Sequence, residues 1–339
     1  MPPTRFQGSK RKLAGWIVGQ IAGLHFDTVL DAFGGTGAVA FEFKRLGKCV
    51  AYNDLLRFNH WIGTAIIENG TDRLTRADID AVRTIDPSRT YDDLIARTFA
   101  DIYFTDDENR WLDVAVQNIS AMSNRRRQAL ACYALFQSAL AKRPYNLFHR
   151  RNLYMRSANV TRTFGNKVTW DRPFDLHFRR FAEQANACVF DNGRPCRALN
   201  RDACDVPGSF DLVYIDPPYV NARGTGVDYH HFYHFLEGLV DYPRWAERID
   251  YASRHRRLLP MESPWTSPST IHAAFRRVFE RFADSILVVS YRSDGVPTID
   301  ELQAMLKRCK RDVRVIEHAR YQYVLSTNRR SHEVLLIGC

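Results

Sequence analysis

The chain has 339 residues, 45% of them hydrophobic, and a formal net charge of +10. This length can bury a substantial core, and no apolar run approaches the roughly 18 residues that a membrane span needs. Seven cysteines without C-x-x-C spacing argue against a disulfide framework and against a metal site. The first residues lack a signal-peptide core, so we expect a cytoplasmic protein, and the positive charge suggests a polyanionic partner.

The first predicted elements form a nucleotide-binding turn. An apolar strand at residues 27–33 runs into Gly34-Gly35-Thr36-Gly37, and a helical stretch follows at 38–46. Glycines permit positive φ and let a ligand approach the backbone closely. The spacing is not G-x-G-x-x-G, so a cofactor loop and a tight structural turn both fit. A strand at 49–52 then leads to Asp54, which could bind ribose hydroxyls, cap the next helix, or do both.

A long middle segment carries an unusual distribution of charge. Residues 114–170 contain ten Lys or Arg and no acid, whereas residues 71–113 contain eleven acids and six bases. An acid-free run of this length favours contact with phosphates, and a solvated basic surface is the alternative. The predicted nucleic-acid contacts are Arg125, Arg126, Lys142, Arg143, Asn146, His149, Arg150, Arg151, Arg162 and Lys167.

The same segment has a mainly helical pattern. Apolar faces predict helices at 107–122, 124–143 and 174–190. Between the last two, apolar residues around a Gly-Asn turn predict a β-hairpin over 159–170, which fits a DNA groove or packs as a flap. A second basic cluster, at 254–257, either lines the same DNA face or is a solvated helix end.

Asp216-Pro217-Pro218-Tyr219 follows an apolar strand at 210–215. Neither proline has an N–H, and a residue before proline avoids the α region, so the strand ends in a stiff, extended turn. Its carbonyl oxygens and the Asp216 carboxylate can then face a ligand, and Tyr219 adds a flat aromatic face. This combination suits a planar base with an exocyclic amine that has left its helix. An ordinary Pro-Pro turn is the alternative.

The remaining pattern alternates helices, at 269–282 and 298–309, with strands, at 285–291, 313–316 and 333–337. Such alternation predicts an α/β fold, a mostly parallel sheet with helices on both faces. Ligands of these sheets bind at the carboxyl ends of the strands. We place the glycine loop, Asp54, Asp202 and Asp216 at those ends.

These residues together resemble the S-adenosylmethionine-dependent amino methyltransferases of DNA, and more narrowly the Dam-type (alpha-class) adenine-N6 group. Arg5-Phe6-Gln7-Gly8-Ser9-Lys10 resembles the group's N-terminal cofactor motif, and Asp31-Ala32-Phe33-Gly34-Gly35-Thr36-Gly37 is similar to its glycine loop. Asp54 and Asp202 fall at the acids that bind the cofactor's ribose and adenine amine. The 216–219 tetrapeptide resembles the catalytic motif, and the order of the motifs is also that of the group.

The resemblance implies a seven-stranded Rossmann-like methyltransferase sheet with one antiparallel strand, S-adenosylmethionine as cofactor and double-stranded DNA as partner, without a metal. It places the catalytic domain at 1–58 and 186–339 and an inserted target-recognition domain at 59–185. The implied catalytic residues are Asp216, Pro217, Pro218 and Tyr219. The implied cofactor-binding residues are Phe6, Gly8, Ser9, Lys10, Asp31, Phe33, Gly34, Gly35, Thr36, Gly37, Asp54, Asp202 and Asp216.

Three other functions remain open at this point: cytosine-N4 methylation, methylation of an RNA adenine, and a catalytically silent DNA-binding subunit. The sequence contains no nuclease motif. If the chain belongs to a restriction system, we expect the endonuclease to be a separate chain that acts on the same site without stable contact.

Overall fold

A computed structural model describes residues 1, 4–158, 167–221, 224–225, 228–318 and 331–339. The chain divides into two units, each described by itself. The sheet unit consists of Gln7–Gly63, Asn192–Tyr229 and Met261–Cys339, and the helical unit of Met1–Phe6, Thr64–Asp191 and His230–Pro260. The helical unit thus takes in residues 230–260 in addition to most of the predicted insertion.

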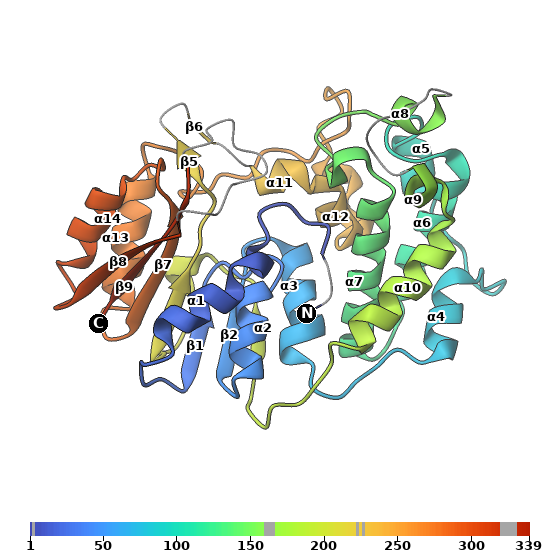
Figure 1. Cartoon of the computed structure of the whole chain (residues 1–339). Helices are drawn as coiled ribbons and strands as arrows, with labels where there is room; N and C mark the ends of the chain where they lie inside the picture. Colours follow the sequence, from blue (N-terminus) through green and yellow to red (C-terminus); the bar gives the residue numbers. More distant parts are fainter. Residues whose placement is uncertain (2–3, 159–166, 222–223, 226–227, 319–330) are drawn as a thin grey trace. The chain divides into compact units, whose positions relative to one another are not determined.

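The sheet unit is built on seven strands in the order β3-β2-β1-β4-β7-β9-β8 (Figure 1). The first five of these strands run parallel, and β9 pairs antiparallel with both of its neighbours. The predicted mostly parallel sheet with one antiparallel strand is therefore confirmed. The strands are β1 (Thr28–Asp31), β2 (Cys49–Asn53), β3 (Arg197–Leu199), β4 (Leu212–Ile215), β7 (Ile286–Arg292), β8 (Val313–His318) and β9 (Glu333–Gly338).

Helices cover both faces of this sheet. Strands β4 and β9 are buried along their whole length, as expected for strands between two helical layers. Leu30 and Val213 share a core cluster with Phe275 of α13 and Leu302 of α14, and the other helices include α1 and α2, which pack together. The helical elements are η1 (Lys10–Lys12), α1 (Ala14–Ile21), α2 (Ala38–Arg45), α3 (Arg57–Gly63), η4 (Ala203–Asp205), α13 (Ile271–Arg281) and α14 (Ile299–Leu306). A small antiparallel ribbon joins β5 (Val220–Asn221) to β6 (Gly224–Thr225).

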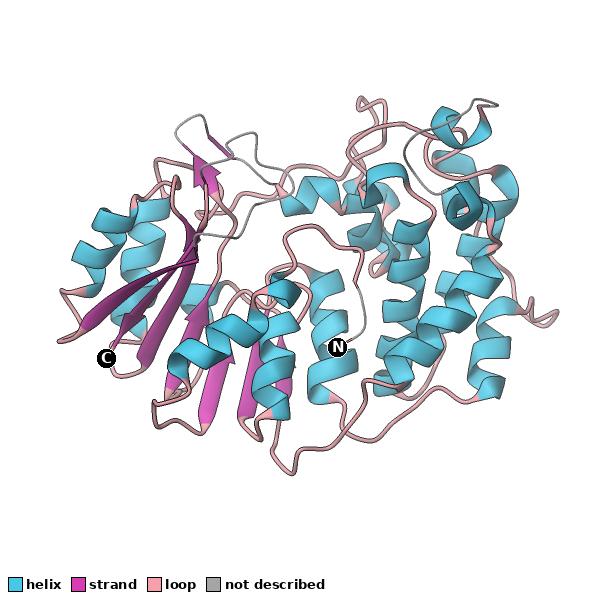
Figure 2. Cartoon of the chain, viewed as in Figure 1, coloured by secondary structure: helices cyan, strands magenta, loops and turns pink. Residues whose placement is uncertain are grey.

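The described part of the helical unit contains helices and loops (Figure 2). Its central helix, α7 (Arg125–Ala141), is buried at every position from 129 to 141, and α10 (Phe174–Asn186) packs along it. A helix that is buried all round needs no amphipathic stripe, which agrees with its apolar composition. The other elements are η2 (Thr64–Glu68), α4 (Arg76–Arg83), α5 (Leu94–Thr98), α6 (Asp106–Ser120), η3 (Pro144–Asn146), α8 (Tyr154–Ser157), α9 (Lys167–Asp171), α12 (His234–Leu239), η5 (Tyr242–Arg244) and η6 (Ala246–Arg248); α11 (Tyr229–Phe232) begins at the unit boundary.

Two predictions for this unit need correction. Residues 159–166 of the predicted hairpin lie outside the described residues, and its second arm is the helix α9 and not a strand. Lys167 and Asp171 form an i,i+4 ion pair of 2.8 Å along α9, and Trp170 is buried, which together favour the helical turn. Of the two alternatives for the basic cluster at 254–257, the helix end is wrong, because residues 254–255 form a turn and 256–257 belong to a loop.

No helix in the described part of the chain is both long and apolar enough to cross a bilayer. Among the same residues, no group of three or more His, Cys, Asp or Glu side chains is arranged to hold a metal ion.

Candidate active site

Four neighbouring parallel strands end at the same edge of the sheet unit. Asp31 at the end of β1 is in register with Tyr52 of β2 and Tyr214 of β4, and Asn53 is in register with Leu199 of β3. The residues that follow these strands therefore meet at one edge. They include the glycine loop, Asp54, Asp202 and Asp216, as the sequence analysis expected.

The glycine loop is held tightly at the end of β2. Gly34 N donates to Asn53 O at 2.7 Å, and Tyr52 Oη donates to Gly35 O at 2.6 Å. A Cβ atom on Gly34 would lie 2.0 Å from the Tyr52 ring, so no larger residue fits there. Gly37 has φ +74° directly before α2, a conformation that favours glycine.

Asp54 joins this loop to the next helix. Its Oδ2 accepts Gly35 N and its Oδ1 accepts Leu56 N, each at 2.8 Å. Burial raises the pKa of Asp54 to about 6, although these hydrogen bonds pull it down. Asp54 therefore links the glycine loop to Leu56, the residue that precedes α3.

Asp31 is buried and keeps one carboxylate oxygen, Oδ1, without a hydrogen bond from any described residue, although backbone N–H groups of Phe33 and Ala40 bond to its carboxyl group. Burial, and then the nearby carboxylates of Asp216 and Asp54, raise its pKa well above the usual range. Asp202 is half-buried and accepts Cys204 N at 2.9 Å. Two carboxylates that raise the pKa of a third, buried one favour a ligand that brings positive charge.

The 216–219 tetrapeptide meets the N-terminal motif through Lys10. Lys10 Nζ lies 2.9 Å from Asp216 Oδ1, and Tyr219 Oη donates to the same oxygen at 3.0 Å. Lys10 Nζ also donates to Tyr219 Oη. Burial alone would lower the pKa of Lys10, but the carboxylates of Asp216 and Glu333 overcome it and the pKa is raised. Burial raises the pKa of Asp216, and the positive charge of Lys10 offsets only part of this rise.

Sequence reasoning missed Glu333, the first residue of β9. Its side chain is 0% exposed, lies 3.2 Å from Lys10 Nζ, and accepts a hydrogen bond from Ser290 Oγ. Tyr219 Oη is 3.5 Å from both of its carboxylate oxygens. An acid that begins an otherwise apolar, buried strand was the available signal, because a buried carboxylate needs a partner.

The rest of the N-terminal motif is divided between the units. Ser9 Oγ lies 3.0 Å from Thr36 Oγ1 of the glycine loop, and Gly8, with φ +79°, packs against the Tyr229 side chain. Phe33 of the loop has its ring edge-on to Trp265, with centroids 4.7 Å apart. Phe6, by contrast, belongs to the helical unit, where its ring packs edge-on against Tyr233.

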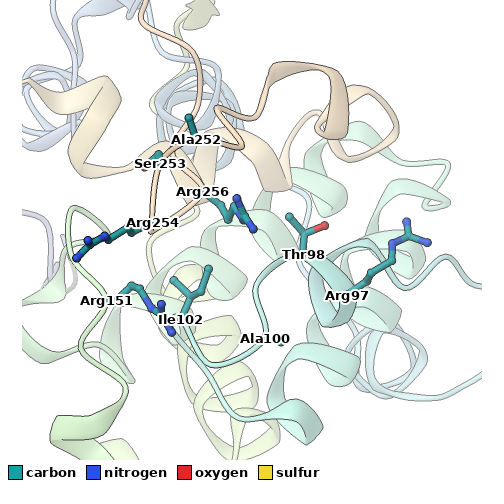
Figure 3. Close-up of a pocket in the computed structure, with 9 residues that line it drawn as sticks. All are labelled: Arg97, Thr98, Ala100, Ile102, Arg151, Ala252, Ser253, Arg254 and Arg256. Carbon is teal, nitrogen blue, oxygen red and sulfur yellow. The ribbon is translucent and has the colours of Figure 1, made fainter.

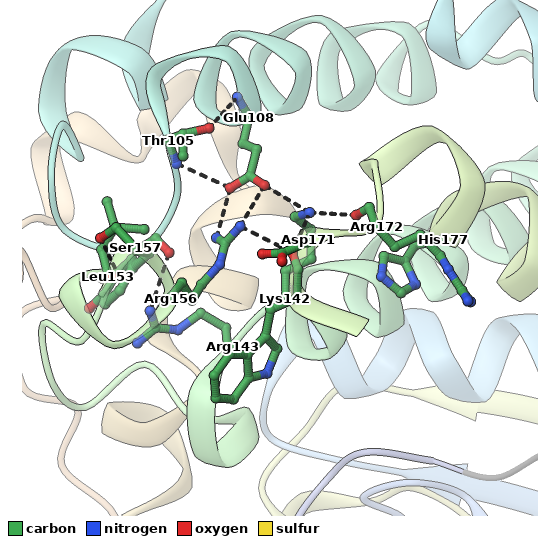
Figure 4. Close-up of polar contacts among 12 residues, drawn as sticks. Thr105, Glu108, Lys142, Arg143, Leu153, Arg156, Ser157, Asp171, Arg172 and His177 are labelled. Atoms are coloured by element: carbon green, nitrogen blue, oxygen red, sulfur yellow. Dashed lines mark hydrogen bonds and ion pairs between the residues drawn. The ribbon is translucent and has the colours of Figure 1, made fainter. Parts of the chain in front are cut away.

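The structure does not support the prediction that Lys142 and Arg143 contact DNA. Each side chain is 1% exposed. Lys142 Nζ pairs with Glu108 at 2.8 Å, and Arg156 makes two 2.7 Å hydrogen bonds to the same carboxylate (Figure 4). Arg143 donates to three backbone carbonyls, those of Tyr103, Leu147 and Arg150. Glu108 precedes the acid-free segment in the sequence, so counting charges within that segment could not reveal this pairing.

The other predicted DNA contacts differ in accessibility. Arg125, Arg150 and Arg151 are exposed, and Asn146 is half-buried. Arg126 pairs with Asp72 at 3.5 Å, and Lys167 pairs with Asp171 at 2.8 Å. Half-buried His149 has its pKa lowered to about 4, by burial and then by Arg150. Arg162 lies outside the described residues.

Comparison with known proteins identifies the family of the chain. The model of the D12 class of N6 adenine-specific DNA methyltransferases matches residues 6–253. Type II methyltransferase M2.HphI of Haemophilus parahaemolyticus is 28% identical, over 99% of this chain and 96% of that protein. Modification methylase StsI of Streptococcus sanguinis is 25% identical over 98% of this chain and 51% of that protein. Type II methyltransferase M.NlaIII of Neisseria lactamica is 22% identical over 95% of this chain and 93% of that protein.

The family match spans most of the chain, which confirms the resemblance and favours adenine in DNA over the three alternatives. The chain belongs to the D12 class of N6 adenine-specific DNA methyltransferases.

Proposed function

We propose that this methyltransferase takes its methyl group from S-adenosylmethionine and transfers it to an adenine that has left the duplex. The observation that carries the proposal is the meeting of the glycine loop, three strand-end acids and the Lys10-bound tetrapeptide at one sheet edge. Sequence motifs far apart in the chain come together there as a family member's cofactor and base sites require.

The residues at this edge fit the cofactor. When bound, S-adenosylmethionine supplies an electrophilic methyl group on a sulfonium sulfur that leaves uncharged. The unpartnered Asp31 Oδ1 and the mutually repelling carboxylates suit its positive charge. Asp54 beside Gly35 can accept hydrogen bonds from ribose hydroxyls. The proposed cofactor-binding residues are Gly8, Ser9, Lys10, Asp31, Phe33, Gly34, Gly35, Thr36, Gly37, Asp54 and Asp202.

Asp216 and the Pro217 carbonyl are proposed to accept the two N–H groups of the adenine amine. Lys10 and Tyr219 both contact Oδ1 of Asp216, which leaves Oδ2 for the amine. The Pro217 carbonyl accepts no hydrogen bond from a described residue, so it can serve as the second acceptor. Both acceptors stabilise the positive charge that develops on nitrogen.

The proposed role of Lys10 is to control the ionisation of Asp216. It keeps Asp216 ionised against a burial that would otherwise favour the neutral acid. Asp216 need not be a strong base, because the amine becomes acidic only once it is methylated. The Tyr219 ring, half-buried and fixed through its hydroxyl, offers a face on which the extruded base can stack.

We assign target recognition to the helical unit, which contains most of the predicted insertion at 59–185. Two of the relatives are named Type II methyltransferases and a third a modification methylase, which supports a restriction-modification setting for this chain. The cognate endonuclease would then be a separate protein that acts on the same site, and the chain would work in the cytoplasm.

The test is transfer of labelled methyl groups from S-adenosylmethionine to unmethylated genomic DNA, followed by nucleoside analysis. We expect the label in N6-methyladenine, and we expect Asp216→Ala to abolish it. Label in N4-methylcytosine, or in RNA but not DNA, would overturn the proposal.

A further inference from the structure

The helical unit contains an arginine-lined pocket with a volume of about 420 Å³ (Figure 3). Three separate stretches of chain supply its walls: α5 with the turn after it, the loop before α8, and the loop at 252–256. Its polar lining consists of Arg97, Arg151, Arg254, Arg256, Thr98 and Ser253. The described lining contains no acid and no amide side chain, so the polar groups are charged donors and hydroxyls.

Three of the four arginines keep their positive charge uncompensated. Arg151 donates to the carbonyl of Asp101 at 3.3 Å, and Arg256 donates to the carbonyl of Tyr251. Carbonyl contacts position a guanidinium without neutralising it. Within the described residues, no carboxylate lies within 4 Å of Arg151, Arg254 or Arg256, whereas Arg97 pairs with Asp93 at 3.3 Å.

The loop that carries Arg254 and Arg256 is fixed in place. Tyr103 Oη donates to the His255 carbonyl at 2.8 Å, and Asp250 N donates to the Arg257 carbonyl at the same distance. Arg256 itself has φ +53°, and Asp101, which lies between the lining residues Ala100 and Ile102, has φ +55°. Backbone strain of this kind in residues other than glycine persists only where the surroundings impose it, and it concentrates at ligand clamps.

We propose that this pocket holds a backbone phosphate of the duplex DNA, and that it positions the duplex without reading its sequence. Guanidinium groups bind phosphates in two-point contacts, and the two hydroxyls can donate to the same oxygens. Reading of adenine typically uses Asn or Gln side chains, which this pocket lacks. The inference rests on the proposed function, because it takes duplex DNA as the substrate.

The test measures binding of a random-sequence DNA duplex as a function of salt, without cofactor. We would compare the wild type with Arg254→Gln, with Arg151→Gln, and with the triple variant that adds Arg256→Gln. Loss of the one phosphate contact should reduce the slope of log affinity against log salt by about 0.9 in the triple variant, and by part of that amount in each single variant. The matched control is Arg76→Gln, a single exposed arginine of the same unit paired with Asp80, which should leave the slope unchanged.

Sequence independence gives the second readout. The triple variant should lose affinity by the same factor for every duplex tested. An unchanged slope in correctly folded Arg254→Gln and Arg151→Gln proteins would overturn the inference, as would an equal loss in Arg76→Gln or tighter binding of duplex RNA. Binding needs no transfer, so a wild type that binds in this way but methylates no DNA would overturn the proposed function alone.

Discussion

Lys10 and Glu333 form a buried ion pair, with Nζ and Oε1 3.2 Å apart and side chains that are 7% and 0% exposed. The same ammonium group also lies 2.9 Å from Asp216. One lysine therefore faces two carboxylates, and the charge of Glu333 raises the pKa of Asp216. Glu333 thus acts on the proposed catalytic acid by direct charge repulsion and by sharing Lys10 with it, and is a positioning residue.

Glu333→Gln should shift the pH profile of methyl transfer. Asp216 must be ionised to accept an N–H, so the rate falls as the pH drops through its folded-state pKa. Loss of the Glu333 charge removes a repulsion and lowers that pKa, so the acid limb should move to lower pH. Single-turnover transfer at saturating DNA and cofactor measures this limb. Glu317→Gln, an exposed glutamate on the neighbouring strand β8, is the control and should leave the limb in place.

Asp216→Asn should reduce the rate of transfer by at least about 100-fold, because it removes the charge that stabilises the developing cation. Binding of cofactor and of duplex DNA should stay close to the wild type. Quenched single-turnover reactions measure the rate of transfer, and equilibrium titrations measure the binding of cofactor and DNA. The control is Asp205→Asn, an exposed acid paired with Arg277. Transfer at a rate near that of the wild type in Asp216→Asn would remove Asp216 from the catalytic role.

The sheet, its order of motifs and the strand-end acids could be predicted from the sequence because each rests on a local pattern. Alternating apolar segments, a glycine loop and a Pro-Pro turn determine structure over a few residues. Glu333 could not be assigned in this way, since its partner Lys10 lies 323 positions away in the chain. The burial of Lys142 could not be predicted for the same reason. Its charge pairs with Glu108 of α6, and only the packing of α6 against α7 brings the two residues together.

Asp54→Asn should change how stability of the cofactor-free protein depends on pH. The folded-state pKa of about 6 exceeds the ordinary value of 3.8, so the folded protein binds the proton more tightly. This stabilising contribution is present below about pH 4 and is lost as the pH rises through about 6. The variant should lack that decline in the free energy of unfolding. It should also bind cofactor about 10-fold or more weakly, since its neutral amide cannot replace the charged acceptor of hydrogen bonds.

Gly34→Ala should disrupt the glycine loop. The added Cβ would lie 2.0 Å from the Tyr52 ring, and overpacking of this kind costs about 1–3 kcal/mol. We expect a lower melting temperature and weaker cofactor binding. Gly15→Ala in α1 is the control: nothing lies within 4 Å of its Cβ, and an alanine in a helix stabilises by about 0.5–1 kcal/mol. Normal cofactor binding by Gly34→Ala would show that the loop does not need this close approach.

Glu108→Gln tests whether Lys142 and Arg156 are structural. The substitution keeps the size of the side chain but leaves two buried cations without their carboxylate, and breaking a buried pair costs about 3–5 kcal/mol. Burial already lowers the pKa of Lys142, and Glu108 opposes that shift. In the variant the pKa of Lys142 should fall further, so the destabilisation should lessen as rising pH lets Lys142 lose its proton.

The control for Glu108 is Asp107→Asn, one position earlier on α6, where the side chain is 92% exposed and pairs with Arg110. An exposed pair of this kind contributes less than about 1 kcal/mol, so this variant should be nearly neutral. Denaturant unfolding across a range of pH measures both proteins. DNA binding by the folded fraction of Glu108→Gln should keep the salt dependence of the wild type, because Lys142 and Arg156 bind within the protein. A steeper salt slope there would instead show that these two cations reach the DNA once Glu108 no longer holds them.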